Sequence, residues 1–217
     1  MQKSVGAALC AGIMLVGTAA QADTFSYNST PNDTWFYGTG NDYAPANTAV
    51  LTTDANSQVY LRLHETFQPA PASDGSGVYS FALGTSNLSF DWGVDNNTAG
   101  FGNVNFSMTL TNIGSGQTIS FSPYLFGFAD NSFQNGSVQN SARVNWFGIG
   151  YDGNVNNTYK VQFDVSGLSG GDKSVTVYAK LGSGAAVPEP ASWALMIAGL
   201  AAIGFTMRRK RMAVSFA

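Results

Sequence analysis

The side chains that could do acid–base chemistry are few, and none forms a recognisable catalytic motif. His64 is the only histidine, and it lies in phase with Tyr60 and Arg62 in an alternating segment, which favours a structural role. A Ser-His-Asp triad is a spatial arrangement that spacing along the chain does not reveal. The chain has no local pattern typical of a nucleophile elbow and no His-Glu-x-x-His zinc motif.

Paired carboxylates would indicate glycoside hydrolysis, since that reaction needs two of them at one bond. Asp91 and Asp95 flank a short segment that begins with Trp92, and Glu65 is the only glutamate before the C-terminal region. We interpret the two aspartates as turn acids beside a core tryptophan. A secreted glycoside hydrolase is therefore the least favoured function, and we expect no catalytic residues.

Oxygen-bearing side chains alternate in one segment that resembles the first half of a calcium loop. Asp152, Asn154 and Asn156 are the candidate ligands. The loop's glycine is replaced by Asn157 and its bidentate glutamate by Phe163. The alternative is a set of turns in which these side chains bond to their own backbone. Apart from this candidate structural calcium, we expect no cofactor.

Aromatic side chains are the remaining resource for binding. Trp35, Phe36 and Tyr37 are consecutive in a polar context and are candidates for stacking on a sugar ring. Trp92 and Trp146 lie in alternating segments, so we expect them in the core.

These residues must be positioned by strands, because apolar and polar residues alternate repeatedly between residues 23 and 181. The expected strands cover 59–67, 78–83, 88–92, 104–111, 118–128, 142–149, 159–165 and 173–180. Strands with one wet face are typical of antiparallel sheets, so we predict an all-β, jelly-roll-like antiparallel β-sandwich, with a β-barrel as the alternative. Residues 23–58 are less regular and are expected to be mostly loop.

Composition narrows the function further. Only 11% of residues are charged, and between residues 23 and 187 five basic residues face twelve acidic ones, a net charge of −7. Nucleic-acid binding requires a basic face, so it is not expected. Cys10 is the single cysteine, which leaves the domain without a disulfide.

Residues 1–22 have the pattern typical of a secretory signal helix. Ala20 and Ala22 form the cleavage signal, and we expect the mature chain to begin at Asp23. A lipoprotein signal acylated at Cys10 is disfavoured because the apolar segment before it would be too short.

The C-terminus changes character after the predicted domain 23–181. A flexible linker at 182–187 leads into a tail over 188–217, which contains an apolar run at 191–207 and a basic cluster at 208–211. The apolar run would span roughly 25 Å as a helix, the lower limit for a transmembrane segment. The basic cluster places the C-terminus in the cytoplasm, so the domain faces outward.

The tail closely resembles the PEP-CTERM sorting signal in its PEPxxWA variant. The matching residues are Pro188, Glu189, Pro190, Trp193, Ala194, Arg208 and Arg209. The resemblance implies recognition by an exosortase, a membrane cysteine transpeptidase, followed by removal of the helix outside the inner membrane of a Gram-negative bacterium. The alternative is an ordinary anchor that is never cut. The same tail is also catalogued as an ice-binding protein C-terminal domain, a label that says nothing about ice binding here.

These observations together predict an exported, non-enzymatic protein of the cell surface or the exopolysaccharide (biofilm) matrix. Its expected partners are the exosortase, transiently the inner membrane, and an extracellular polysaccharide as a candidate ligand. The alternative function is a carbohydrate-binding module of the envelope.

Overall fold

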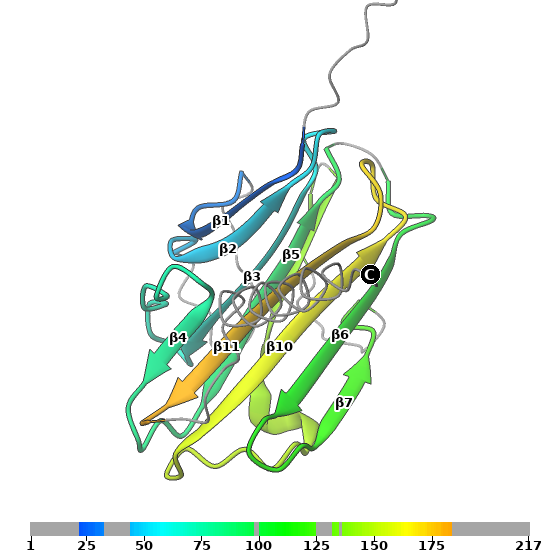
Figure 1. Cartoon of the computed structure of the whole chain (residues 1–217). Coiled ribbons are helices and arrows are strands. Elements are labelled where there is room, and N and C mark those ends of the chain that lie inside the picture. The colour runs from blue at the N-terminus through cyan, green and yellow to red at the C-terminus, as the bar shows by residue number, and fades with distance from the viewer. Residues whose placement is uncertain (1–21, 33–43, 98–99, 125–131, 135, 184–217) are drawn as a thin grey trace, which may run out of the picture.

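Eleven strands and one short 3-10 helix make up the regular structure in the described residues of the computed structural model, which are 22–32, 44–97, 100–124, 132–134 and 136–183. The strands form two sheets (Figure 1). The predicted all-β class is therefore confirmed, and its origin lies in the alternating β-branched and aromatic residues.

The first sheet, sheet A, has six strands that pair antiparallel throughout. In spatial order these are β1 (Thr24–Ser29), β2 (Thr48–Thr52), β3 (Gln58–Glu65), β5 (Leu88–Asp95), β9 (Ser137–Arg143) and β8 (Ser132–Gln134).

The second sheet, sheet B, has five strands and is mixed rather than antiparallel. In order these are β4 (Val78–Phe81), β11 (Lys173–Leu181), β10 (Asn157–Ser166), β6 (Asn105–Asn112) and β7 (Thr118–Phe121). The β4–β11 pair is parallel, so the prediction of a wholly antiparallel, jelly-roll-like arrangement is wrong at this edge. A parallel pair needs a crossover instead of a hairpin, and here the chain reaches β4 from β3 of the other sheet.

The two sheets pack face to face on one hydrophobic core. Leu61 and Trp92 project into it from sheet A, and Phe163 and Val177 from sheet B. The rings of Trp92 and Phe163 meet across the layers with their centres 5.4 Å apart. The core placement predicted for Trp92 is confirmed, since its side chain is fully buried.

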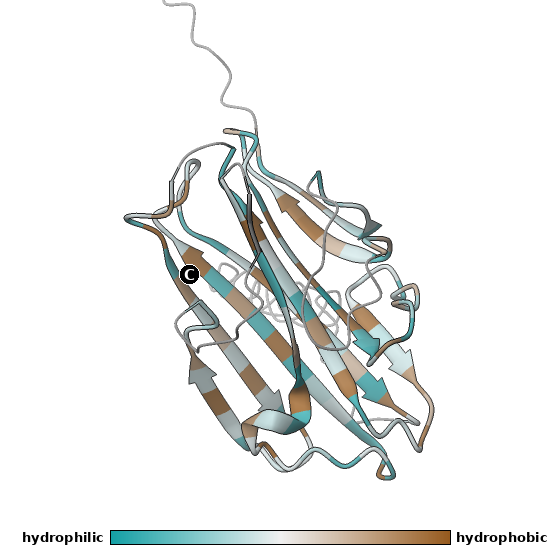
Figure 2. Cartoon of the chain, turned by 180° about the vertical axis from the view of Figure 1, so that it is seen from behind, coloured by the Kyte–Doolittle hydropathy of each residue, from teal (hydrophilic) through white to brown (hydrophobic). Residues whose placement is uncertain are grey.

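Sheet B follows the simple pattern of one buried and one wet face. Along β6 every second residue is buried, and β10 and β11 alternate in the same way. Hydrophobic and hydrophilic residues alternate visibly along the strands (Figure 2). The expectation of one wet face is confirmed for this sheet.

Two sequence expectations are wrong in detail. The stretch 23–58 contains β1 and β2. β1 is a short edge strand with mostly exposed side chains, and the alternation of Phe25 and Tyr27 is too brief to distinguish it from a loop. The strand expected at 142–149 begins earlier and ends at Arg143, where the 3-10 helix η1 (Val144–Phe147) takes over. Gly148 closes that helix in the left-handed conformation.

The predicted signal segment up to residue 21 and the sorting tail 188–217, with its transmembrane run 191–207, lie outside the described residues. Across the described ranges, no helix has the length and apolarity needed to cross a bilayer. The described strands begin at Thr24 and end at Leu181.

Candidate functional site

Sheet A has one face on the hydrophobic core and one face that points away from it. Many side chains on the second face are polar, and they are nevertheless buried. Cross-strand pairing of β3, β5 and β9 aligns its side chains in three rows: Tyr60–Gly93–Gln139, Arg62–Asp91–Ser141 and His64–Ser89–Arg143. All of these residues except Arg143 are buried. The expected wet face is therefore wrong for sheet A, since other parts of the chain cover it.

Part of this cover comes from the segment before β2 and the segment after β3. The Nη1 atom of Arg62 donates to the carbonyl oxygens of Ala44 and Ala46. Asn47 donates through Nδ2 to the carbonyl oxygen of Ala70 at 2.8 Å, which links the two covering segments.

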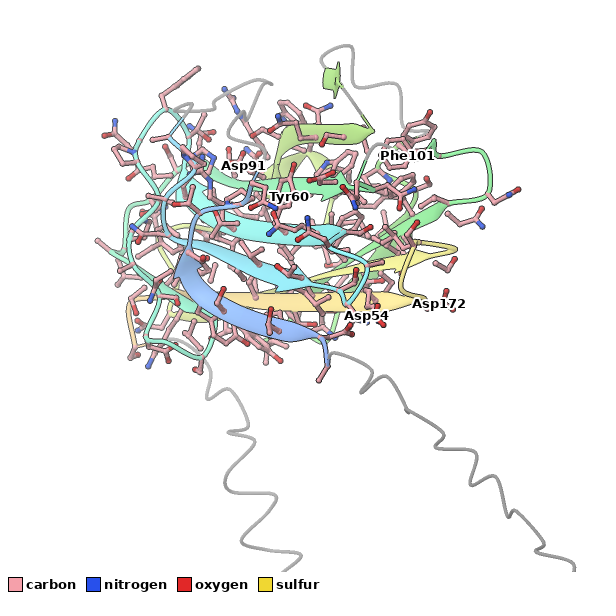
Figure 3. The ribbon with its side chains drawn as sticks, turned by 90° about the horizontal axis from the view of Figure 1, so that it is seen from above. Asp54, Tyr60, Asp91, Phe101 and Asp172 are labelled. Carbon is pink, nitrogen blue, oxygen red and sulfur yellow. The ribbon has the colours of Figure 1, made fainter. Side chains whose placement is uncertain are left out.

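Arg62, His64 and Asp91 form a charged cluster at the centre of this face. The Nε atom of Arg62 lies 2.6 Å from Oδ2 of Asp91, and Nε2 of His64 lies 3.1 Å from Oδ1. All three side chains are fully buried. Asp91 and its neighbour Tyr60 lie together over sheet A (Figure 3). The interpretation of Asp91 as a turn acid is wrong, because it occupies the middle of β5.

The contacts of His64 favour its doubly protonated form. Its Nδ1 atom lies 2.9 Å and 3.1 Å from the carbonyl oxygens of Glu65 and Gln68, which only accept hydrogen bonds. Its Nε2 atom faces the carboxylate of Asp91, which when ionised also only accepts. Burial alone would lower the pKa of His64, but the charge and hydrogen bond of Asp91 outweigh it, so the pKa is raised.

Asp91 stays ionised despite its burial. Burial would raise the pKa of its carboxyl group, but the positive charges of His64 and Arg62 and the hydrogen bond from His64 lower that pKa to about 2. The three groups thus stabilise one another as ions.

The contacts of His64 hold neighbouring backbone in place and differ from those of a catalytic histidine. In a Ser-His-Asp triad, one ring nitrogen faces the aspartate and the other faces the nucleophile. In His64 the second nitrogen is held by backbone carbonyls instead, which leaves no lone pair to accept a proton. The described contacts of His64 are therefore not those of a general base.

The two aspartates considered for glycoside hydrolysis are not brought together. Asp91 and Asp95 lie four residues apart on one strand, which corresponds to about 13 Å. Glycosidase carboxylates lie at most about 9.5 Å apart. The carboxylate of Asp95 accepts from the backbone nitrogen of Asn97 at 2.8 Å, which agrees with its expected role as a turn acid.

The backbone carbonyls that hold His64 belong to a tight turn after β3. The backbone nitrogen of Gln68 donates to the carbonyl oxygen of Glu65 at 2.8 Å, and Phe67 lies between them with φ of 65°. The third position of a turn with positive φ normally takes Gly or Asn. In the described chain, the other non-glycine residues with positive φ are all asparagines: Asn28, Asn47, Asn56 and Asn97.

The exposed rings of Phe67 and Trp146 and the partly buried Arg143 form a group that we call the aromatic platform. The guanidinium carbon of Arg143 lies 5.9 Å from the ring centre of Phe67 and 5.6 Å from that of Trp146. Phe67 is 65% exposed and Trp146 is 46% exposed. The core placement expected for Trp146 is therefore wrong, because it lies on η1 and not on a strand.

This platform was not predicted from the sequence because Phe67 lies far along the chain from the segment that holds Arg143 and Trp146. One signal was available, namely a large aromatic residue in the polar stretch Glu65-Thr66-Phe67-Gln68, just where an alternating segment ends.

The residues of the candidate calcium loop have backbone partners. Oδ1 of Asp152 accepts from the backbone nitrogen of Asn154 at 2.9 Å, and Oδ1 of Asn156 accepts from that of Ser183 at 2.8 Å. Within the described ranges, no three His, Cys, Asp or Glu side chains cluster as metal ligands would. The calcium site stays a prediction. Asn156 instead binds the backbone at the start of the predicted linker.

The remaining predicted site residues cannot be placed by this geometry. Those outside the described residues are Ala20, Trp35, Phe36, Tyr37, Pro188, Glu189, Pro190, Trp193, Ala194, Arg208 and Arg209. Ala22 is the first described residue and is exposed.

A comparison with protein families identifies the motif in the C-terminal tail. A family model described as the PEP-CTERM protein-sorting motif matches residues 186–211. The chain carries a PEP-CTERM sorting motif. This confirms the resemblance, identifies an exported protein and makes an exosortase the kind of partner that processes it. The matched span lies outside the β domain, and no curated protein and no solved structure matches the chain.

Proposed function

We propose that the chain is a non-enzymatic component of the bacterial cell surface or extracellular polysaccharide matrix, delivered there by its PEP-CTERM motif. The observation that carries this proposal is the motif at 186–211, placed directly after an all-β domain whose strands end at Leu181. The domain itself, with its two stacked sheets, is inferred to be a β-sandwich with a parallel edge pair.

The delivery route follows from the order of the tail. The apolar run 191–207 holds the exported chain in the inner membrane, and the basic cluster 208–211 keeps its end in the cytoplasm. The exosortase cuts near Pro188–Pro190 and removes the helix, after which the domain is released or attached outside the cell.

The non-enzymatic part of the proposal is supported by the way the titratable groups are used. His64 has both ring nitrogens in hydrogen bonds, and Asp91 is bound by Arg62 and His64. These groups position the chain instead of facing a substrate.

Mass spectrometry of the exported protein tests the route. The expected product begins near Asp23 and ends near Pro188–Pro190. Glu189→Ala is expected to retain the tail, whereas Ser183→Ala, in the linker, should be processed normally. Recovery of a wild-type chain that still ends at Ala217 would contradict the processing step.

A carbohydrate-binding role is the second candidate, and one observation favours it. Two large aromatic side chains, Phe67 and Trp146, are exposed, and both ring centres lie within 6 Å of the guanidinium carbon of Arg143. Aromatic faces stack on the apolar faces of sugar rings, and exposed large rings in a small group are uncommon on surfaces without a binding role. A glycan array with the exported protein tests this candidate in general terms.

A further inference from the structure

We infer that the aromatic platform, Phe67, Arg143 and Trp146, is a binding site for an acidic polysaccharide, one whose sugar rings carry carboxylates. The inference rests on the carbohydrate-binding candidate and goes further by naming the site and the chemical class of the ligand.

The backbone of Phe67 is the first observation. A residue with a bulky side chain is strained at a backbone φ of 65°. Packing of the Phe67 ring offsets little of that strain, because the side chain is 65% exposed. Every other described non-glycine residue with positive φ is an asparagine, which tolerates this conformation. A residue with a strained backbone and a solvent-exposed ring indicates a functional role instead of a contribution to stability.

The turn that carries this ring is held from several sides. His64 bonds to the carbonyl oxygens on both sides of Phe67, at Glu65 and Gln68. Thr66 donates through both its backbone nitrogen and its Oγ1 to the carbonyl oxygen of Asn87, at 2.9 Å and 3.0 Å. The buried charged cluster therefore fixes the platform before any ligand arrives, which lowers the entropy cost of binding.

Arg143 supplies the charge of the site. Its Nε atom is buried and has no hydrogen-bond partner, and no described carboxylate forms an ion pair with it. Arg143 is only partly buried, and its guanidinium carbon lies within 6 Å of both ring centres, so a ligand stacked on the rings would meet its charge. A guanidinium edge matches a carboxylate with two parallel hydrogen bonds.

The surroundings favour an anion locally although the domain is acidic overall. With His64 protonated, Arg62, His64 and Arg143 carry positive charge on this face against Asp91, which leaves +2, and Glu65 in the turn reduces it to +1. The stretch 23–187 as a whole carries −7. Rings for stacking with a cation beside them fit a polymer of uronic acids better than a neutral glucan.

Affinity electrophoresis of the full chain in mild detergent tests the site, with polygalacturonate as the acidic probe and dextran as the neutral one. Polygalacturonate is expected to retard the chain and dextran is not. Arg143→Gln, Trp146→Ala and Phe67→Asn should each weaken binding to polygalacturonate at least tenfold. Phe25→Ala, which removes a 42% exposed aromatic ring on β1, is the matched control and should bind as the wild type does.

The outcomes separate the site from the broader proposals. Retention that survives all three substitutions, or that is equal for dextran, overturns the site or its acidic specificity. A Phe67→Asn chain that loses thermal stability but keeps binding would show that the ring only packs on Arg143. If no polysaccharide binds at all, the carbohydrate-binding candidate fails too, while the processed termini still test delivery independently.

Discussion

The outer faces of the two sheets have the same alternating sequence pattern but different environments. The outer face of sheet B meets solvent, whereas that of sheet A is buried. On sheet B, Ser107 on β6 is exposed and Lys160, Gln162 and Asp164 are partly exposed along β10. On sheet A, the corresponding positions of β3 and β5 are buried. Alternation therefore tells which residues leave the core, but not whether water meets them there.

The chemistry of the two faces differs accordingly. Lys160, Gln162 and Asp164 form a chain of side-chain hydrogen bonds at 3.0–3.2 Å near solvent, where such contacts contribute little to stability. Arg62 and Asp91 pair without solvent, so removing one partner leaves a buried charge uncompensated. Substitutions at matched positions of the two sheets can test this contrast.

The largest expected effect is that of Asp91→Ala. It leaves Arg62 and His64 buried without their shared counter-ion, and the free energy of unfolding should fall by about 3–5 kcal/mol. Urea denaturation measures the change. Asp164→Ala on β10 is the control and should change it by less than about 0.5 kcal/mol. Equal losses in the two variants would remove the distinction between the faces.

Gly93→Ala is expected to have the next largest effect. A Cβ at Gly93 would lie 2.1 Å from the ring of Tyr60, which rests on that glycine across the strands and is fully buried. Displacing the ring should cost about 1–3 kcal/mol, readable as a lower thermal midpoint. Gly102→Ala, with nothing within 4 Å of the added atom, should be tolerated.

The stability should also depend on pH through His64. Because the pKa of His64 is raised in the folded state, its contribution is fully present below the unfolded value of about 6.5 and is lost as pH rises through the folded pKa. Urea midpoints should therefore decline above pH 6.5. His64→Gln should flatten that slope, and since the chain has no second histidine, an unchanged slope would contradict the assignment.

The smallest effect, and the only stabilising one, is expected for Phe67→Asn. Asparagine tolerates positive φ, so the substitution should leave the free energy of unfolding unchanged or raise it by up to about 1 kcal/mol. Calorimetry of the variant beside Asn56→Phe, which introduces the same strain at φ of 60°, gives the comparison. The second variant should be destabilised by a similar amount.

Much of the fold was predictable because its signals are local. The strands expected at 159–165 and 173–180 are confirmed as β10 and β11, since alternation there coincides with one buried face. The sorting motif was predictable for a similar reason, because order and spacing along the chain define it.

The candidate site was less predictable because its contacts join distant segments. The phase that places His64 beside Arg62 can be seen in the sequence, but the register that sets Asp91 opposite Arg62 depends on pairing β3 with β5. Asp91 looked like a turn acid because a carboxylate in a strand is costly without its partners. The platform needed the same tertiary information, since the turn after β3 brings Phe67 to Arg143 from a distant part of the chain.

The exit of the chain at Leu181 sets how far the domain can travel from its anchor. β11 ends beside the end of β4, in the same direction, and the 82–87 loop joins this end to the turn of Phe67 through Asn87 (Figure 1). Ser183 is still bonded to Asn156, so only about five residues, at most about 18 Å, separate the domain from Pro188. Under the proposed function, the domain held by its tail could therefore reach only polymer in the layer next to the membrane, and cleavage by the exosortase would be the step that widens its range.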